Sequence, residues 1–134
     1  MNAQSTDAWA RRIVERAADT AAASLRKFCR KPRSPKRLHR ARKSLARLLA
    51  GLYDVAGVAG TDGRLIARVR DLHRRAGKVR DADVLLKRVK AYRNVAGGAE
   101  LEELKTVAHK LRKRRKKARR KLQALIDDLP ALRQ

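Results

Sequence analysis

Hydrophobic residues recur every three or four positions along most of the chain, and three breaks interrupt this pattern. The breaks lie at Pro32–Pro35, Gly57–Gly63 and Gly97–Gly98. Spacings of three and four place side chains on one face of an α-helix, and no segment alternates convincingly in the way that strands do. The sequence therefore predicts a single domain over residues 1–134. Its four helices are expected at roughly residues 6–30, 35–56, 62–96 and 99–128.

Three of the expected helices keep the 4-3 spacing of a packed helical seam. In the third helix the seam runs from Leu65 through Leu72 and Val79 to Leu86, and the fourth helix has a similar row. Ser34 followed by Pro35 is typical of the start of a helix. Four such helices with short connections favour an all-α fold, an antiparallel up-down four-helix bundle.

The composition agrees with a helical, globular chain. Of the 134 residues, 43% are hydrophobic, and 3% are aromatic. The start of the chain lacks the features of a secretory leader, and no apolar run approaches the length of a membrane span, so we expect a soluble, cytoplasmic protein. The single cysteine, Cys29, cannot form an internal disulfide and is interpreted as a small residue at a helix end.

Charge is the most unusual property of the sequence. Lys and Arg number 37 against 13 Asp and Glu, which gives a net charge of +24. No acid occurs from Thr20 to Tyr53 or from Lys105 to Lys121, and each of these stretches carries eleven Lys or Arg. A compact body with this charge repels itself, so a large polyanion is the expected partner.

The second helix has the clearest basic surface. On a helical wheel its leucines occupy one side, and a straight row of four cations repeats at 4-3-4 spacing on the other, with His39 at its edge. The row is about 16 Å long and suits a linear phosphate chain. A solvated helix face would normally interleave acids with the cations, and none occur here. The row consists of Lys36, Arg40, Lys43 and Arg47.

Two seam positions are charged, Asp83 in the third helix and Arg115 in the fourth. Counting from the Gly97–Gly98 turn places them at heights that differ by only about 6 Å, which predicts an ion pair held partly out of water. The same counting places His39 level with about Lys78 to Arg80. One level of the bundle is therefore predicted to gather cations around an anionic ligand. The alternative is that most of these side chains point outward into solvent.

Two motifs resemble those of a known family. The run Leu38-His39-Arg40-Ala41-Arg42, continuing to Arg47-Leu48, resembles the V-H-x-x-R…R-L motif of the conserved-histidine α-helical domain, CHAD. The run from Gly77 to Leu86 resembles that family's second signature, G-x-a-R-D-x-D-V-L. This resemblance implies a non-catalytic helical domain that binds inorganic polyphosphate in a basic central pore.

The resemblance also implies roles for particular residues. His39, Arg42 and Arg47 would line the pore, while Arg80 belongs to the second motif together with Asp81 and Asp83, which would orient it. Helical-wheel geometry, independent of the family, adds further candidate ligands: Lys36, Arg40, Lys43, Arg112, Arg115, Lys116 and Arg119.

The chain departs from the family pattern in two ways. Arginines are usual seven and ten positions after the motif histidine, where this sequence has Ala46 and Leu49. A full family member contains two related bundles, whereas this chain has one and resembles half a domain. The half-length form predicts a homodimer whose subunits together form the pore.

Other function classes fit the residues less well. Binding to the backbone of DNA or RNA needs the same charges and is the alternative function, although aromatic and amide side chains for reading bases are scarce. An enzyme would need clustered carboxylates or a glycine-rich phosphate loop, which we do not find. The histidine and cysteine spacings predict no metal or cofactor, and the basic helices lack the aromatic residues of a membrane-inserting face. If polyphosphate is the ligand, association with polyphosphate granules is expected.

Overall fold

The computed structural model describes residues 3–59 and 63–129, and these residues form four helices without a strand. The helices are α1 (Ala3–Arg30), α2 (Pro35–Ala59), α3 (Gly63–Arg93) and α4 (Gly98–Asp127). The all-α bundle expected from the sequence is confirmed. Helix α1 begins three residues earlier than expected and α3 ends three residues earlier, while the expected start of the third helix, residue 62, lies outside the described residues.

Local sequence sets the ends of two helices. The Ser34 hydroxyl accepts a hydrogen bond of 3.3 Å from the backbone N–H of Arg37, so the predicted cap in front of Pro35 is confirmed. At the turn before α4, Gly98 has a φ of +61°, a left-handed conformation in which a Cβ would be strained. Glycine is therefore favoured at the first position of α4.

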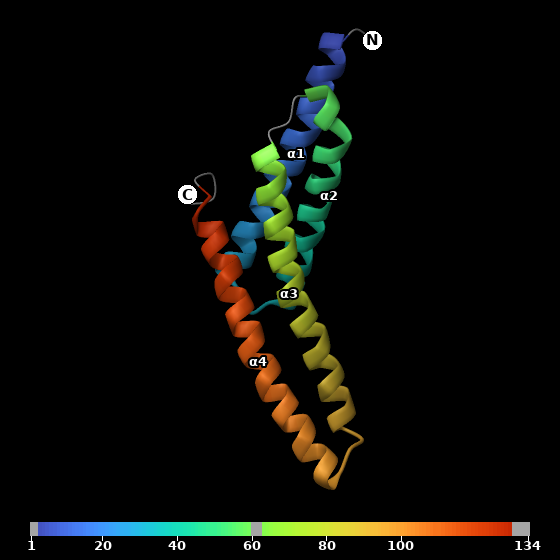
Figure 1. Cartoon of the computed structure of the whole chain (residues 1–134), viewed down its shortest axis with the longest axis vertical. Coiled ribbons are helices and arrows are strands. Elements are labelled where there is room, and N and C mark those ends of the chain that lie inside the picture. Colours follow the sequence, from blue (N-terminus) through green and yellow to red (C-terminus); the bar gives the residue numbers. More distant parts are fainter. Residues whose placement is uncertain (1–2, 60–62, 130–134) are drawn as a thin grey trace.

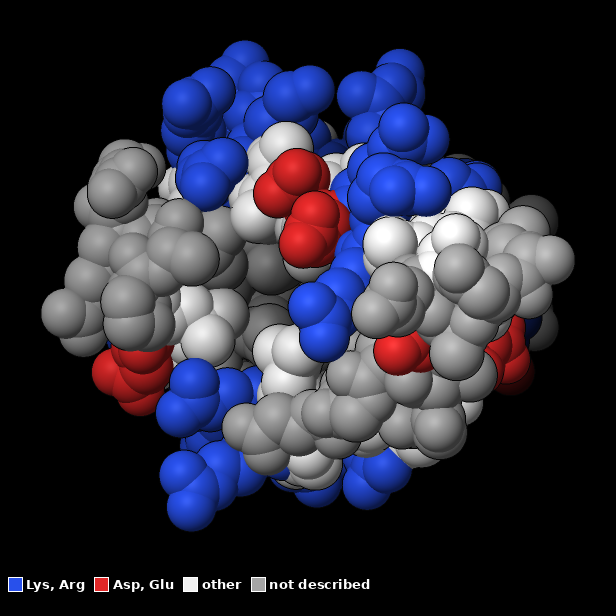
Figure 2. All heavy atoms as spheres, turned by 90° about the horizontal axis from the view of Figure 1, so that it is seen from above, with Lys and Arg blue, Asp and Glu red and all other residues white. Residues whose placement is uncertain are grey.

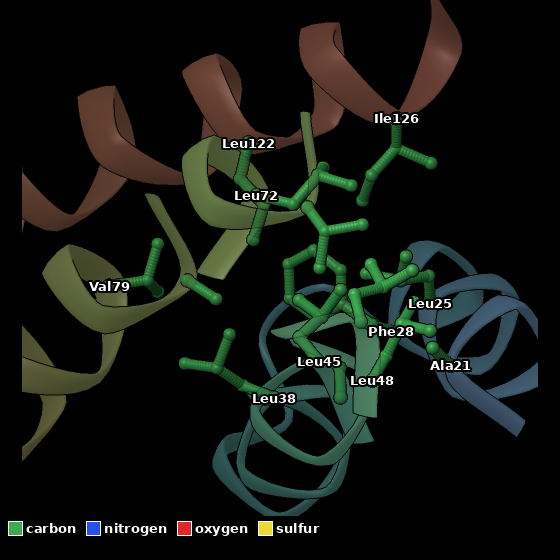
Figure 3. Close-up of a cluster of buried hydrophobic side chains, with 14 residues drawn as sticks. Ala21, Leu25, Phe28, Leu38, Leu45, Leu48, Leu72, Val79, Leu122 and Ile126 are labelled. Carbon is green, nitrogen blue, oxygen red and sulfur yellow. The ribbon is translucent and has the colours of Figure 1, made fainter. Parts of the chain in front are cut away.

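One hydrophobic core joins all four helices (Figure 3). Phe28 from α1 and Leu45 from α2 are buried in this core, as are Val79 from α3 and Leu122 from α4. These residues lie on the apolar faces that the 3- and 4-residue spacings predict. Burial of such side chains contributes roughly 1.5–3 kcal/mol each, which accounts for why the helices pack along these faces.

The two helical hairpins are offset along the long axis of the molecule (Figure 1). Each helix packs chiefly against its neighbour in sequence: α1 on α2, α2 on α3, and α3 on α4. The α3–α4 hairpin continues past the other two helices and forms one end of the molecule alone, held by a smaller cluster around Val89, Ala108 and Leu111. Where α2 begins, at Pro35, it stops covering the α3–α4 hairpin. In the part of the hairpin that extends past this point, the sides of α3 and α4 that would otherwise contact α2 are therefore uncovered.

Candidate functional site

A groove of about 1050 Å³ lies between α3 and α4 where α2 no longer covers them. Its α3 wall extends from Arg80 to Arg93, with Asn94 just past the end of the helix. Its α4 wall extends from Leu101 to Arg115, and Pro35 lies at its border with α2. We call this the main groove. It follows directly from the offset of the hairpins, because a longer α2 would fill it.

The lining of the main groove is strongly basic. Eight of its lining residues are Lys or Arg, and Asp83 is the one acid among them. The face seen along the long axis shows the same excess: Lys and Arg gather in several groups, and Asp and Glu are fewer (Figure 2). The basic lining residues are Arg80, Lys87, Arg88, Lys90, Arg93, Lys105, Arg112 and Arg115.

Asp83 holds two arginines of α4. Nη1 of Arg115 donates a hydrogen bond of 3.1 Å to Oδ1 of Asp83, and Nη2 of Arg119 lies 3.9 Å from the same oxygen. The predicted Asp83–Arg115 pair is confirmed. Burial, followed by the nearby charge of Arg115, lowers the pKa of Arg119, so one carboxylate does not fully compensate the two cations.

Arginine side chains of α2 and α4 have buried donors without an acceptor. The Nε atoms of Arg42, Arg115 and Arg119 are buried, and no described residue accepts a hydrogen bond from them. The Arg42 side chain reaches from α2 to α3, where its Nε lies 3.9 Å from the position that a Cβ of Gly77 would occupy. Burial and the charge of Arg42 lower the pKa of neighbouring His73. Each unsatisfied donor of this kind costs about 1–3 kcal/mol.

The three charged residues of the Arg80-Asp81-Ala82-Asp83 run have different environments. Arg80 and Asp83 are three apart on α3 and both line the main groove, whereas Asp81 is exposed and lines a smaller groove elsewhere. Only Asp83 is thus placed to orient arginines of the main groove.

The structure does not bring the predicted residues of α2 into the main groove. His39 is exposed, and so are the four cations of the row Lys36, Arg40, Lys43 and Arg47. None of these five side chains lines the groove, to which α2 contributes Pro35. Of the candidates on α4, Arg112 and Arg115 line the groove, Arg119 lies next to Asp83, and Lys116 is exposed outside it. The predicted site is therefore divided between an inner groove and an outer row.

Sequence reasoning missed five cations of the groove: Lys87, Arg88, Lys90, Arg93 and Lys105. One signal could have indicated Lys87, which lies seven positions after Arg80 and hence on the same helical stripe. The others needed the offset of the hairpins, which is not visible in the spacing of any single helix.

Other kinds of site have less support. Among residues 3–59 and 63–129, no three His, Cys, Asp or Glu side chains are grouped so that they could hold a metal ion. None of the helices in this part of the chain combines the length and apolar character that crossing a membrane requires. Burial, with the charge of Asp127, raises the pKa of the Cys29 thiol, which packs against the core. This agrees with a structural role for that cysteine.

Comparison with known proteins gives one match. The model of the CHAD domain matches residues 5–133, nearly the full chain. No curated protein and no solved structure matches.

Proposed function

Because the chain belongs to the CHAD domain family, we propose that it binds inorganic polyphosphate along the main groove without converting it chemically. CHAD domains are associated with polyphosphate binding, and they are generally binding domains and not catalysts. The observation that carries the proposal is the groove lining, in which eight cations surround one acid.

The shape of the groove suits a chain of phosphates better than a single one. Thirteen residues separate Arg80 from Arg93 on the α3 wall, which corresponds to about 20 Å of helix. Cations line both walls over this length, with Arg80 on α3 and Arg112 on α4. Arginine can hold two phosphate oxygens at once, and lysine adds less directional charge. Successive phosphates would thus meet cations from alternate sides.

Asp83 has a specific role in this mechanism. Without ligand it holds Arg115 at the groove wall, at 3.1 Å, and shares its charge with Arg119. An incoming phosphate competes for the same guanidinium groups and also supplies acceptors for their remaining donors. The positive end of α2, which starts at Pro35 beside the groove, adds to the attraction.

The direct test is binding of fluorescently labelled polyphosphate to the variant R80Q/K87Q/R112Q, measured by anisotropy. The matched control is R11Q/R12Q/R16Q, which removes the same charge from exposed positions of α1. We expect the groove variant to bind more than about tenfold more weakly and the slope of log affinity against log salt to fall by about two. Equal weakening by the two variants would show that only net charge matters and would refute the proposed site.

Non-specific binding of DNA or RNA is the second candidate function. It is favoured by the exposed α2 row, Lys36, Arg40, Lys43 and Arg47, because a long phosphate backbone can lie along a convex surface without entering a groove. Competition separates the two functions. Polyphosphate should displace a bound oligonucleotide at a much lower phosphate concentration than the reverse, and the opposite order would favour the nucleic-acid function.

We further propose that two chains associate so that their α3–α4 hairpins enclose the ligand. The uncovered end of the hairpin exposes the apolar side chains of Tyr92, Val95 and Val107, which a second chain could cover. Light scattering with and without polyphosphate tests this, and a strict monomer in both cases would refute it. In cells we expect cytoplasmic protein at polyphosphate granules, which imaging of a tagged chain would reveal.

A further inference from the structure

A second basic groove lies on the other side of the contact between α3 and α4. It has a volume of about 370 Å³ and shares no lining residue with the main groove. Lys78 lines it, whereas Arg80, two positions further along α3, lines the main groove; two positions correspond to about 200° around a helix. We call it the rear groove.

The charges of the rear groove are almost unbalanced. Five cations line it, Arg75 and Lys78 from α3 and Arg114, Lys117 and Lys121 from α4, against the single acid Asp81. The α4 cations are spaced at three and four residues, so they form one row that faces the α3 pair across the groove. Like charges at this spacing destabilise a helix, so helix stability does not explain the arrangement.

The cations of the two helices are close enough to influence one another. The charges of Lys117 and Arg75, followed by desolvation and the charge of Lys78, lower the pKa of Lys121. Arg75 also lies 3.9 Å from Asp71, but no described acid pairs with Lys78, Lys117 or Lys121. A bound polyanion would relieve this mutual repulsion.

We propose that the rear groove is a second binding site for a linear phosphate chain, so that one molecule holds two stretches of polyanion on opposite sides of the α3–α4 hairpin. Its floor consists of Ala82, Leu85 and Ala118, with no aromatic or amide side chain to contact a base. The floor therefore favours an inorganic chain over nucleic acid. The ligand class rests on the proposed function, whereas the site itself does not depend on the main groove.

The consequence is bridging. A molecule with two separate sites can hold distant parts of one long polyphosphate chain, or link two polyphosphate chains. When both sites bind the same polyphosphate chain, the second site binds at a high effective concentration. This property would suit a protein that gathers polyphosphate.

Isothermal titration with tripolyphosphate, which is too short to occupy both grooves, counts the sites. We expect K78Q/K117Q/K121Q to bind one tripolyphosphate fewer per chain than the wild type and R11Q/R12Q/R16Q do. The three lysines are exposed, so the variant should fold, and circular dichroism checks that it does. An unchanged number of sites in folded K78Q/K117Q/K121Q would overturn the rear groove.

The main-groove variant R80Q/K87Q/R112Q separates this failure from failure of the proposed function. If it keeps both sites while K78Q/K117Q/K121Q loses one, the main groove is wrong and the rear groove stands. A single-stranded oligonucleotide serves as the competitor. If it displaces tripolyphosphate from R80Q/K87Q/R112Q at a lower phosphate concentration than long polyphosphate does, the assignment of an inorganic ligand to the rear groove is overturned.

Discussion

Replacing Asp83 with Asn should lower stability and at the same time strengthen polyphosphate binding. The Asp83 side chain is 6% exposed and lies 3.1 Å from Arg115 and 3.9 Å from Arg119. A pair of unit charges at such distances is worth about 4 kcal/mol at an effective dielectric constant of 20. The Arg115 side chain is 26% exposed and regains some hydration when its partner is lost, so we expect a loss of about 2 kcal/mol.

The effect on binding has the opposite sign. D83N removes the one acid that lines the main groove, so Arg115 no longer has an internal competitor for phosphate. One unit charge at about 4 Å in water contributes about 1 kcal/mol, which corresponds to about a fivefold gain in affinity. A carboxylate with only a structural role would weaken binding or leave it unchanged when it is removed.

Two assays test this prediction together. Thermal unfolding of D83N should show a midpoint about 6–10 °C below the wild type, given the size of the chain. D81N is the stability control, because Asp81 is exposed and undergoes the same change in charge, and it should change stability by less than about 0.5 kcal/mol. Binding is measured in the K78Q/K117Q/K121Q background, so that only the main groove contributes. The reasoning is wrong if folded D83N does not bind polyphosphate more tightly than the wild type, or if it unfolds at the wild-type temperature.

Three further predictions follow from the structure. The logarithm of polyphosphate affinity should fall linearly with the logarithm of salt concentration, and an affinity independent of salt would contradict capture by charge. Burial and Arg42 lower the pKa of His73 below 6.5, so as the pH falls past 6.5 the unfolded chain takes up the proton first and the folded state loses stability. Denaturant unfolding at about pH 7.5 and about pH 5.5 should therefore show a larger loss in the wild type than in H73Q, and equal losses would refute this. Gly98→Ala should lower the free energy of unfolding by about 1 kcal/mol, because Gly98 has a positive φ. Gly77→Ala should raise it by about 0.5–1 kcal/mol, because Gly77 lies within a helix and has room for a Cβ. The opposite order of stability for the two variants would refute this prediction.

The hydrophobic spacing was sufficient to predict the fold because it reports burial directly. Leu38, Val79 and Leu122 are buried where the helical periods place them, and the Asp83–Arg115 pair follows from counting residues around one turn. Leu65 shows the limit of this reasoning, since it fits the seam but is 44% exposed at the start of α3. A seam position is buried only where another helix covers it.

The site was harder to predict because it depends on where one helix ends relative to another. A helical wheel places Lys36 and Arg47 opposite the leucines of α2, but it does not say where the ends of the other helices leave a groove. The main groove exists because α3 and α4, at 31 and 30 residues, extend past α2, at 25 residues. Arg93 and Lys105 lie in the uncovered part, so only the packed arrangement identifies them as lining residues.

A crystal structure with bound polyphosphate tests the central claim most directly, because it distinguishes the main groove from the exposed basic row of α2. We predict a row of phosphates between α3 and α4, with oxygens in contact with Arg80, Arg112 and Arg115. Phosphates bound along Lys36 and Arg47 on the outside of α2, with none in the main groove, would contradict this claim.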